Sequence, residues 1–255
     1  MRPVYKLLIE RAEACNNTAF IPNDPIDVPH RFSQQGDIEV AAFFAALFAW
    51  GQRKTILNKT RDLMMRMDND PFAFVMSASP LELRAIEGFV HRTFNAQDVV
   101  DLIYALRATH NRHGSWEVLF QPHKNEHNFG PSITRFREEM LKHVSNPTRV
   151  SRFLSDPSRG SAAKRIVMFL RWMVRQDNAG VDFGIWKTLP MSKLSCPLDV
   201  HTARSARKLK LLTRKQNDWR AVEELDEHLR LIDPNDPARF DYALFCMGLE
   251  DAADL

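Results

Sequence analysis

Apolar residues recur at the three- and four-residue spacing of an α-helix along almost the whole chain. No segment alternates convincingly between apolar and polar residues, as a half-buried β-strand would. The chain has 255 residues, of which 44% are hydrophobic, enough to bury one large core or the cores of two small lobes. We therefore expect an all-α fold. Helices are expected at residues 3–15, 37–67 with a break near Gly51, 80–87, 96–113, 115–120, 131–144, 161–176, 199–210, 218–231 and 237–247.

The composition limits the compartment and the kinds of site. The formal net charge is only +3, so a binding site for a polyanion must come from local clustering of charge. The cysteines Cys15, Cys196 and Cys246 lie far apart, which favours a reducing compartment and argues against a disulfide framework or a four-thiolate metal site. The charged N-terminus lacks the apolar core of a signal peptide, and the longest apolar run, residues 40–50, is too short to span a bilayer. A cytoplasmic protein without membrane contact is expected.

Basic charge is concentrated in residues 201–215, which contain no acid. The cations of this segment are Arg204, Arg207, Lys208, Lys210, Arg214 and Lys215. On a helix, Arg204, Arg207 and Lys208 share one face, because they lie three and four residues apart. Such neighbouring cations repel one another unless an anion lies against them, and a nucleic-acid backbone is such an anion. The alternative is a solvated surface with counterions.

A lysine and an aspartate open two of the expected helices. Lys164 begins an apolar helix in which Arg171 and Arg175 would lie within about 20° of it around the axis, as a cationic stripe. The positive end of the helix dipole disfavours the charged form of an amine at this place. Asp199 begins the basic helix. An amine and a carboxylate so placed suit covalent chemistry on a phosphate-bearing polymer. The alternatives are an ordinary solvent-exposed lysine and a plain helix cap.

Four histidines have spacings that also occur in zinc sites: His110, His113, His123 and His127. Their surroundings have the composition of a polar loop, with no thiol nearby and Glu126 as the one close acid after His123. We therefore expect no metal site and no cofactor. His201 is expected to orient the turn at Asp199 or to cap a helix.

The motifs around Lys164 and Asp199 resemble those of the helix-hairpin-helix DNA glycosylase superfamily. That signature is a tight hairpin, then a helix that starts with lysine in the bifunctional members, then an aspartate in the pattern D-x-H-x-x-R. Here the hairpin would be residues 157–161 (Pro-Ser-Arg-Gly-Ser), and the aspartate pattern is residues 199–204. The hairpin has one glycine in place of L-P-G-x-G. No cysteine cluster follows Asp199, which excludes the iron–sulfur form.

The chain is also similar, over nearly its full length, to a bacterial family related to the archaeal oxidised-guanine glycosylases. The long interval between Lys164 and Asp199 and the atypical hairpin resemble those archaeal enzymes. Residues 50–55 (Trp-Gly-Gln-Arg-Lys-Thr) resemble the turn with which the superfamily wedges into the duplex, so Gln52 would be the wedge.

The resemblance implies a two-lobed helical fold with a cleft between the lobes. Residues 37–160 would form one lobe, and residues 1–36 with 161–255 the other. It also implies a monomeric, nucleoid-associated DNA repair enzyme, a bifunctional glycosylase and AP lyase that acts on double-stranded DNA with a damaged base, preferably an oxidised purine. Lys164 would attack the sugar C1′ and form a Schiff base, and Asp199 would stabilise the positive charge that develops there.

Further residues are assigned to the DNA. The expected nucleic-acid contacts are Gln52, Arg159, Gly160, Ser161, His201, Arg204, Arg207 and Lys208. The extruded base would stack on aromatic side chains, for which Trp172, Phe183 and Trp186 are candidates, with membership of the hydrophobic core as their alternative. The alternative function is a non-catalytic helix-hairpin-helix protein that binds DNA or RNA.

Overall fold

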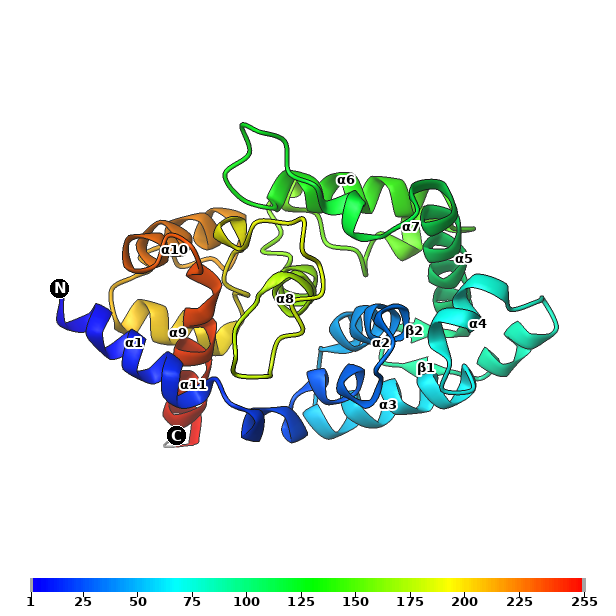
Figure 1. Ribbon diagram of the computed structural model, residues 1–255, viewed down its shortest axis with the longest axis horizontal. Coiled ribbons are helices and arrows are strands. Elements are labelled where there is room, and N and C mark those ends of the chain that lie inside the picture. Colours follow the sequence, from blue (N-terminus) through cyan, green and yellow to red (C-terminus); the bar gives the residue numbers. More distant parts are fainter. Residues whose placement is uncertain (1, 254–255) are drawn as a thin grey trace. The chain divides into compact units, whose positions relative to one another are not determined.

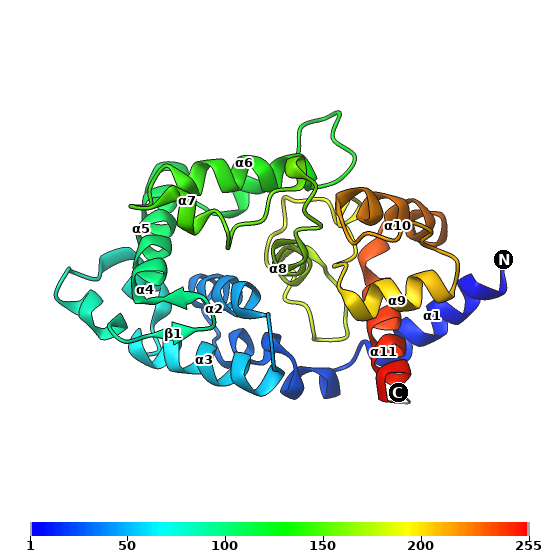
Figure 2. The same ribbon diagram turned by 180° about the vertical axis from the view of Figure 1, so that it is seen from behind.

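The computed structural model describes residues 2–253, with side chains as far as Glu250, and most of these residues are helical (Figures 1 and 2). The α-helices are α1 (Pro3–Cys15), α2 (Gln35–Phe48), α3 (Arg53–Arg66), α4 (Pro71–Ser77), α5 (Ala96–His113), α6 (Gly130–Leu141), α7 (Pro147–Val150), α8 (Lys164–Val174), α9 (Val200–Lys208), α10 (Trp219–Ile232) and α11 (Phe240–Ala253). The 3-10 helices are η1 (Thr18–Asn23), η2 (Pro25–Asp27), η3 (Pro29–Arg31), η4 (Glu82–Ile86), η5 (Glu117–Phe120), η6 (Pro157–Arg159), η7 (Met191–Lys193) and η8 (Pro237–Arg239). The all-α prediction is confirmed.

Helices with clear end signals lie where the sequence predicts them. α1 and α5 begin and end at the expected residues. α1 has proline at its first position, and α5 has a capping box between Asn95 and Asp98 and a left-handed Gly114 after its last residue. The expected helix at 37–67 is two helices, α2 and α3, because Gly51 has a φ of 112°, which interrupts the helix between them.

The short elements were not predicted. α4 has seven residues and α7 has four, and each has proline in its first turn and an Asp or Asn cap, at Asp70 and Asn146. The strands β1 (Val90–His91) and β2 (Phe94–Asn95) form an antiparallel pair. Elements of this length are too short to show a period of two or 3.6 residues. The segments expected as helices at 80–87 and 115–120 contain the 3-10 helices η4 and η5.

The chain divides into two compact units, and each is described by itself. Unit 1 comprises Met1–Phe20, Pro122–Ile133 and Asp156–Leu255, and unit 2 comprises Ile21–Gln121 and Thr134–Ser155. The lobes expected from the sequence, 37–160 and 1–36 with 161–255, stay a prediction.

The core of unit 1 is built around α8 and α11. Every residue of α8 from Ile166 to Val174 is buried. α11 packs against α1 and against α9, so that three helices distant in the sequence meet. Asp241, the second residue of α11, also accepts hydrogen bonds from Arg171 of α8 and from Thr202 of α9.

The core of unit 2 is built around α2. Its residues from Ile38 to Phe48 are all buried, as expected for a helix that is apolar on every side. Phe48 packs against Phe89, with ring centroids 5.5 Å apart, and against Phe94 at 5.1 Å. Phe48 is the last residue of α2, so this aromatic cluster adjoins the turn that joins α2 to α3.

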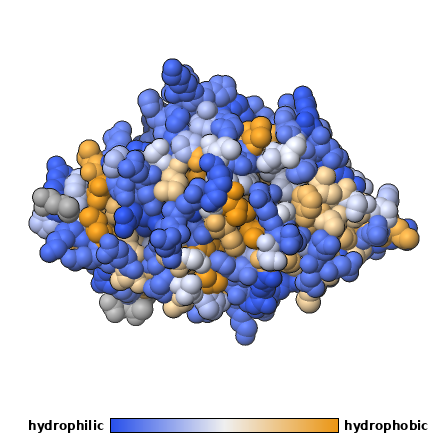
Figure 3. Space-filling model, in the orientation of Figure 1, coloured by the Kyte–Doolittle hydropathy of each residue, from blue (hydrophilic) through white to orange (hydrophobic). Residues whose placement is uncertain are grey.

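Hydrophilic side chains cover most of the face drawn in Figure 3, with smaller apolar patches among them. Within residues 2–253, no helix combines the length and the apolar character that crossing a membrane requires.

Candidate functional site

Three helix starts of unit 1 contribute side chains to one site. Lys164 is the first residue of α8, Asp199 is the N-cap of α9, and Asp241 is the second residue of α11. Lys164 and Asp199 are half-buried, and Asp241 is buried. Two of these three residues are the predicted catalytic pair.

Asp199 caps its helix through one carboxylate oxygen. Oδ1 accepts hydrogen bonds from the backbone N–H of His201 at 2.8 Å and of Thr202 at 2.9 Å. Within the described part of the chain, Oδ2 accepts no hydrogen bond. Capping therefore leaves the second oxygen available for another partner, so the cap and a chemical role are compatible.

Asp241 is the hub of the site. Its Oδ2 accepts a hydrogen bond from Arg171, and its Oδ1 accepts one from the Thr202 hydroxyl at 3.3 Å and one from the Cys196 thiol at 3.6 Å. Burial raises the pKa of Asp241 to about 6; Arg171 and Lys164 counteract this shift, and the charge of Asp199 adds to it. Lys164 and Asp199 thus both lie within electrostatic range of one buried carboxyl group.

The loop before α8 is tightly held. The Asp156 carboxylate accepts hydrogen bonds from the Ser158 backbone at 3.0 Å and from its hydroxyl at 2.7 Å. Gly160 has a φ of 84°, and Ala163, which immediately precedes Lys164, has a φ of 47°. A left-handed alanine costs about 1–3 kcal/mol and persists only where its surroundings impose it. The loop therefore fixes the direction in which α8 and Lys164 leave it.

The loop amides are already used. The N–H groups of Arg159, Gly160 and Ser161 donate to the carbonyls of Asp156 and Pro157 at 2.9–3.2 Å. A phosphate at this loop would therefore meet the exposed Arg159 guanidinium and the Ser161 hydroxyl rather than a row of free amides. The loop is also joined to the start of α10, whose Trp219 N–H donates to the Gly160 carbonyl at 3.1 Å.

Of the three cations expected on the basic face of α9, one donates hydrogen bonds within the fold. Arg204 and Lys208 are exposed. The Arg207 guanidinium, however, donates to the carbonyls of Arg214 and Lys215, both at 2.9 Å, and to Asn217 at 2.6 Å. These donors hold the turn after α9, and the expected phosphate contact of Arg207 stays a prediction.

His201 and Gln52 also have definite places. His201 is half-buried, and its Nδ1 lies 3.2 Å from the Gly248 carbonyl, so the ring holds α9 against α11. Gln52 belongs to unit 2, where it is exposed at the N-cap position of α3.

The predicted base pocket is corrected for its two tryptophans. Trp172 and Trp186 are both 0% exposed, and Trp186 packs edge-on against Phe169 with ring centroids 5.3 Å apart. Both belong to the hydrophobic core and offer no face to a base. Phe183 is half-buried.

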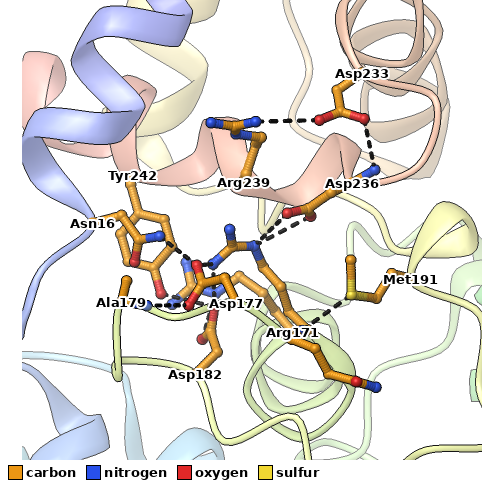
Figure 4. Close-up of polar contacts among 12 residues, drawn as sticks. Asn16, Arg171, Asp177, Ala179, Asp182, Met191, Asp233, Asp236, Arg239 and Tyr242 are labelled. Carbon is orange, nitrogen blue, oxygen red and sulfur yellow. Dashed lines mark hydrogen bonds and ion pairs between the residues drawn. The ribbon is translucent and has the colours of Figure 1, made fainter.

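The cationic stripe expected below Lys164 is a buried ion-pair network (Figure 4). Arg171 and Arg175 are 3% and 2% exposed. Arg175 contacts Asp236 at 2.9 Å and Asp182 at 3.1 Å, and Asp182 also accepts the Tyr242 hydroxyl at 2.8 Å. Sequence reasoning missed Asp236 because it lies 61 residues from Arg175 in the chain, and it missed Asp182 because an irregular segment separates it from α8. The available signal was two arginines one turn apart in an otherwise apolar helix, since buried charges need partners.

A polar cavity of about 310 Å³ adjoins this network. Its lining includes Asn16, Arg175, Asp177, Asp236 and Arg239. The charges are already paired with one another, as between Arg175 and Asp177 at 2.6 Å. The cavity is therefore lined by charges that are already paired and is not a site with unbalanced charge.

The histidines with zinc-like spacing do not come together around a metal. His113 lies 3.5 Å from Glu139, and His110 packs against Trp116 with ring centroids 5.0 Å apart. Among the side chains that the structure describes, no group of three or more His, Cys, Asp or Glu residues could hold a metal ion.

Comparison with known proteins gives a family. The family model of DUF2400, described as a protein of unknown function, matches residues 24–250. A search of curated proteins found no match, and a search of solved structures found none either. Because the matched region covers most of the chain, this protein belongs to the DUF2400 family.

Proposed function

We propose that this protein is a DNA glycosylase with associated AP-lyase activity, which excises a damaged base, preferably an oxidised purine, from double-stranded DNA. The observation that carries the proposal is the convergence of Lys164 and Asp199. They come from separate helix starts, and both act on the buried carboxyl group of Asp241. The resemblance to the helix-hairpin-helix DNA glycosylases supplies the reaction.

The proposed chemistry assigns one step to each residue. The neutral amine of Lys164 attacks C1′, the bond from C1′ to the base nitrogen breaks, and its electron pair leaves with the base, which takes up a proton. The Asp199 carboxylate stabilises the positive charge that builds at C1′. The bond from C1′ to the ring oxygen then breaks, the ring oxygen takes up the second amine proton, and the Schiff base remains between C1′ and the Lys164 nitrogen. Removal of a proton from C2′ then expels the 3′ phosphate.

A second candidate is a helix-hairpin-helix protein that binds DNA or RNA without excising a base. It is favoured by the burial of Trp172 and Trp186, which removes the expected walls of a base pocket. Both candidates use the exposed cations Arg204 and Lys208, so binding alone does not distinguish them.

Borohydride trapping on lesion-bearing duplexes tests the enzyme directly. Borohydride reduces a Schiff base to a stable amine, so the wild-type protein should become linked to the DNA strand. Lys164→Ala should abolish the adduct. Lys187→Ala is the matched control, because Lys187 is an exposed lysine of the same unit, and it should leave the adduct unchanged.

Asp199→Asn tests the carboxylate separately from the fold. Asparagine caps a helix about as well as aspartate, so α9 should be retained. Loss of the negative charge should slow excision roughly 100- to 1,000-fold. An adduct that persists in Lys164→Ala would assign the nucleophile to another amine, and the absence of adduct and excision with every lesion would favour the binding protein.

A further inference from the structure

An exposed tryptophan with an arginine stacked on it lies in the turn between α2 and α3, in unit 2. Trp50 is 36% exposed, and the Arg92 guanidinium lies 4.5 Å from the centroid of its ring. The remaining tryptophans are buried: Trp116 is 3% exposed, Trp172 0%, Trp186 0% and Trp219 8%. Trp50 is thus the one tryptophan of the chain with a large solvent-facing surface.

Both segments that carry the stack contain a residue with a positive φ angle. Gly51 has a φ of 112°, and a Cβ atom there would lie 2.6 Å from Arg92 Nη1. Arg92 itself has a φ of 54°, a left-handed conformation that is unfavourable for a residue with a side chain. The hairpin accounts for this φ: His91 pairs with Phe94, so Arg92 is the first residue of a two-residue loop, where a positive φ is required. The hairpin turn thereby sets the position from which the Arg92 side chain reaches Trp50.

The stack stands on a rigid base. His91, the residue before Arg92, is 2% exposed, and its Nε2 lies 3.0 Å from the Phe48 carbonyl. The Phe94 ring, on the other strand of the hairpin, stacks on Phe153 with centroids 3.7 Å apart. Both segments that carry the stack are thus anchored in the aromatic core of unit 2.

The helix that follows the turn begins with two exposed cations, Arg53 and Lys54. The later cations of α3 are paired: Lys59 and Arg66 with Asp62, and Arg61 with Asp27. Lys54 is exposed and forms no ion pair with any residue that the structure describes. A partner that combines negative charge with flat aromatic rings would complement this surface, and a nucleic-acid strand has both properties.

We propose that Trp50 and Arg92 form a stacking site for an unpaired nucleobase of a nucleic-acid strand. The base would extend the Trp50–Arg92 stack, and the exposed cations at the start of α3, Arg53 and Lys54, would attract the phosphates on either side of it. This site does not depend on Lys164 or on any chemistry at C1′. It therefore stands or fails separately from the proposed enzyme activity.

Tryptophan fluorescence provides the first test. A short, undamaged single-stranded oligothymidylate should quench the emission of the full-length protein, because stacking places a base against the exposed indole. Inorganic polyphosphate is the matched ligand, since it has the charge of a backbone without bases, and it should not quench. Equal quenching by both ligands, or by neither, would overturn the proposal.

Substitutions locate the site. Measured by anisotropy of a labelled oligothymidylate, Trp50→Ala should weaken binding roughly 5- to 150-fold. Trp50→Phe should retain most of the affinity. Arg92→Lys keeps the charge but loses the flat guanidinium, so it should weaken binding if the stack matters. Unchanged affinity in Trp50→Ala would refute the stacking site.

Unit 2 contains a matched control in Tyr104 and Arg107 of α5. Tyr104 is 38% exposed, and Arg107 lies 5.7 Å from its ring centroid. Arg107, however, donates to the carbonyls of Val75 and Ala78 at 2.6 and 2.9 Å, so its guanidinium is already held by the fold. Tyr104→Ala should leave affinity and quenching unchanged. A loss equal to that of Trp50→Ala would indicate general disturbance of unit 2 and would also refute the site.

Discussion

At the scale of single residues, the sequence identifies which side chains are unusual but not what they contact. Lys164 and Asp199 stand out because each opens a helix, and the charges of both act on the buried carboxyl group of Asp241. Asp241 itself has no sequence signal, because its partners Arg171 and Cys196 lie 70 and 45 residues away in the chain. Contacts over such separations depend on the packing of helices, which no local pattern encodes.

A second buried carboxyl group, Asp226, makes stability depend on pH. It is 0% exposed and accepts the Cys196 N–H at 3.1 Å. Burial raises its pKa to about 6, and Arg230 offsets only part of this shift. Because the folded pKa lies above the unfolded value of about 3.9, the protonated form favours folding. This contribution is complete below about pH 4 and is lost as the pH rises to about 6.

The free energy of unfolding in urea, measured between about pH 4 and pH 6, tests this pH dependence. Over this range the wild type should lose up to about 3 kcal/mol relative to Asp226→Asn, which has no proton to lose. Only the difference between the two proteins is informative, because other groups titrate in both. A constant difference across the range would contradict the assignment.

At the scale of elements, end signals decided which helices could be predicted. α1 and α5 were predicted to the residue because proline, a capping box and a left-handed glycine mark their ends. The short α4, α7 and the β1–β2 hairpin were missed, because four to seven residues show no period. The basic helix α9 was placed correctly, but the sequence did not predict that Arg207 holds the turn that follows.

This difference predicts that neighbouring arginines of α9 have separate roles. Arg207→Ala removes donors to two carbonyls and to Asn217, so it should lower the free energy of unfolding by about 1–3 kcal/mol. Arg204→Ala removes an exposed side chain and should change stability by less than about 0.5 kcal/mol. Thermal or urea unfolding of the two variants checks this, and equal losses would contradict it.

At the scale of the whole molecule, a formal charge of +3 gives little general attraction for DNA. Binding should therefore depend on a few exposed cations in each unit. Arg204 and Lys208 lie in unit 1, and Lys54 lies in unit 2. The sequence does not indicate that residues 122–133 belong to unit 1. The segments before and after them, 21–121 and 134–155, belong to unit 2.

Salt dependence of DNA binding measures these contributions. Each of Arg204→Ala, Lys208→Ala and Lys54→Ala should reduce the slope of log K against log salt by about 0.9 if the cation contacts one phosphate. Lys6→Ala serves as the control, because Lys6 is exposed and already lies 3.7 Å from Glu10. Slopes that do not change in any of the three variants would show that these cations are ordinary surface charge.

The left-handed Ala163 has a consequence for engineering. Glycine would adopt the same φ of 47° without steric conflict, so the alanine keeps strain at the residue that aims Lys164. Replacement by glycine would remove that strain. It would also let the backbone at residue 163 adopt other conformations, so that the direction of the Lys164 side chain would be less fixed. Selection of thermostable variants would therefore meet a trade-off at this position, where a gain in stability comes with a less fixed direction of the Lys164 side chain.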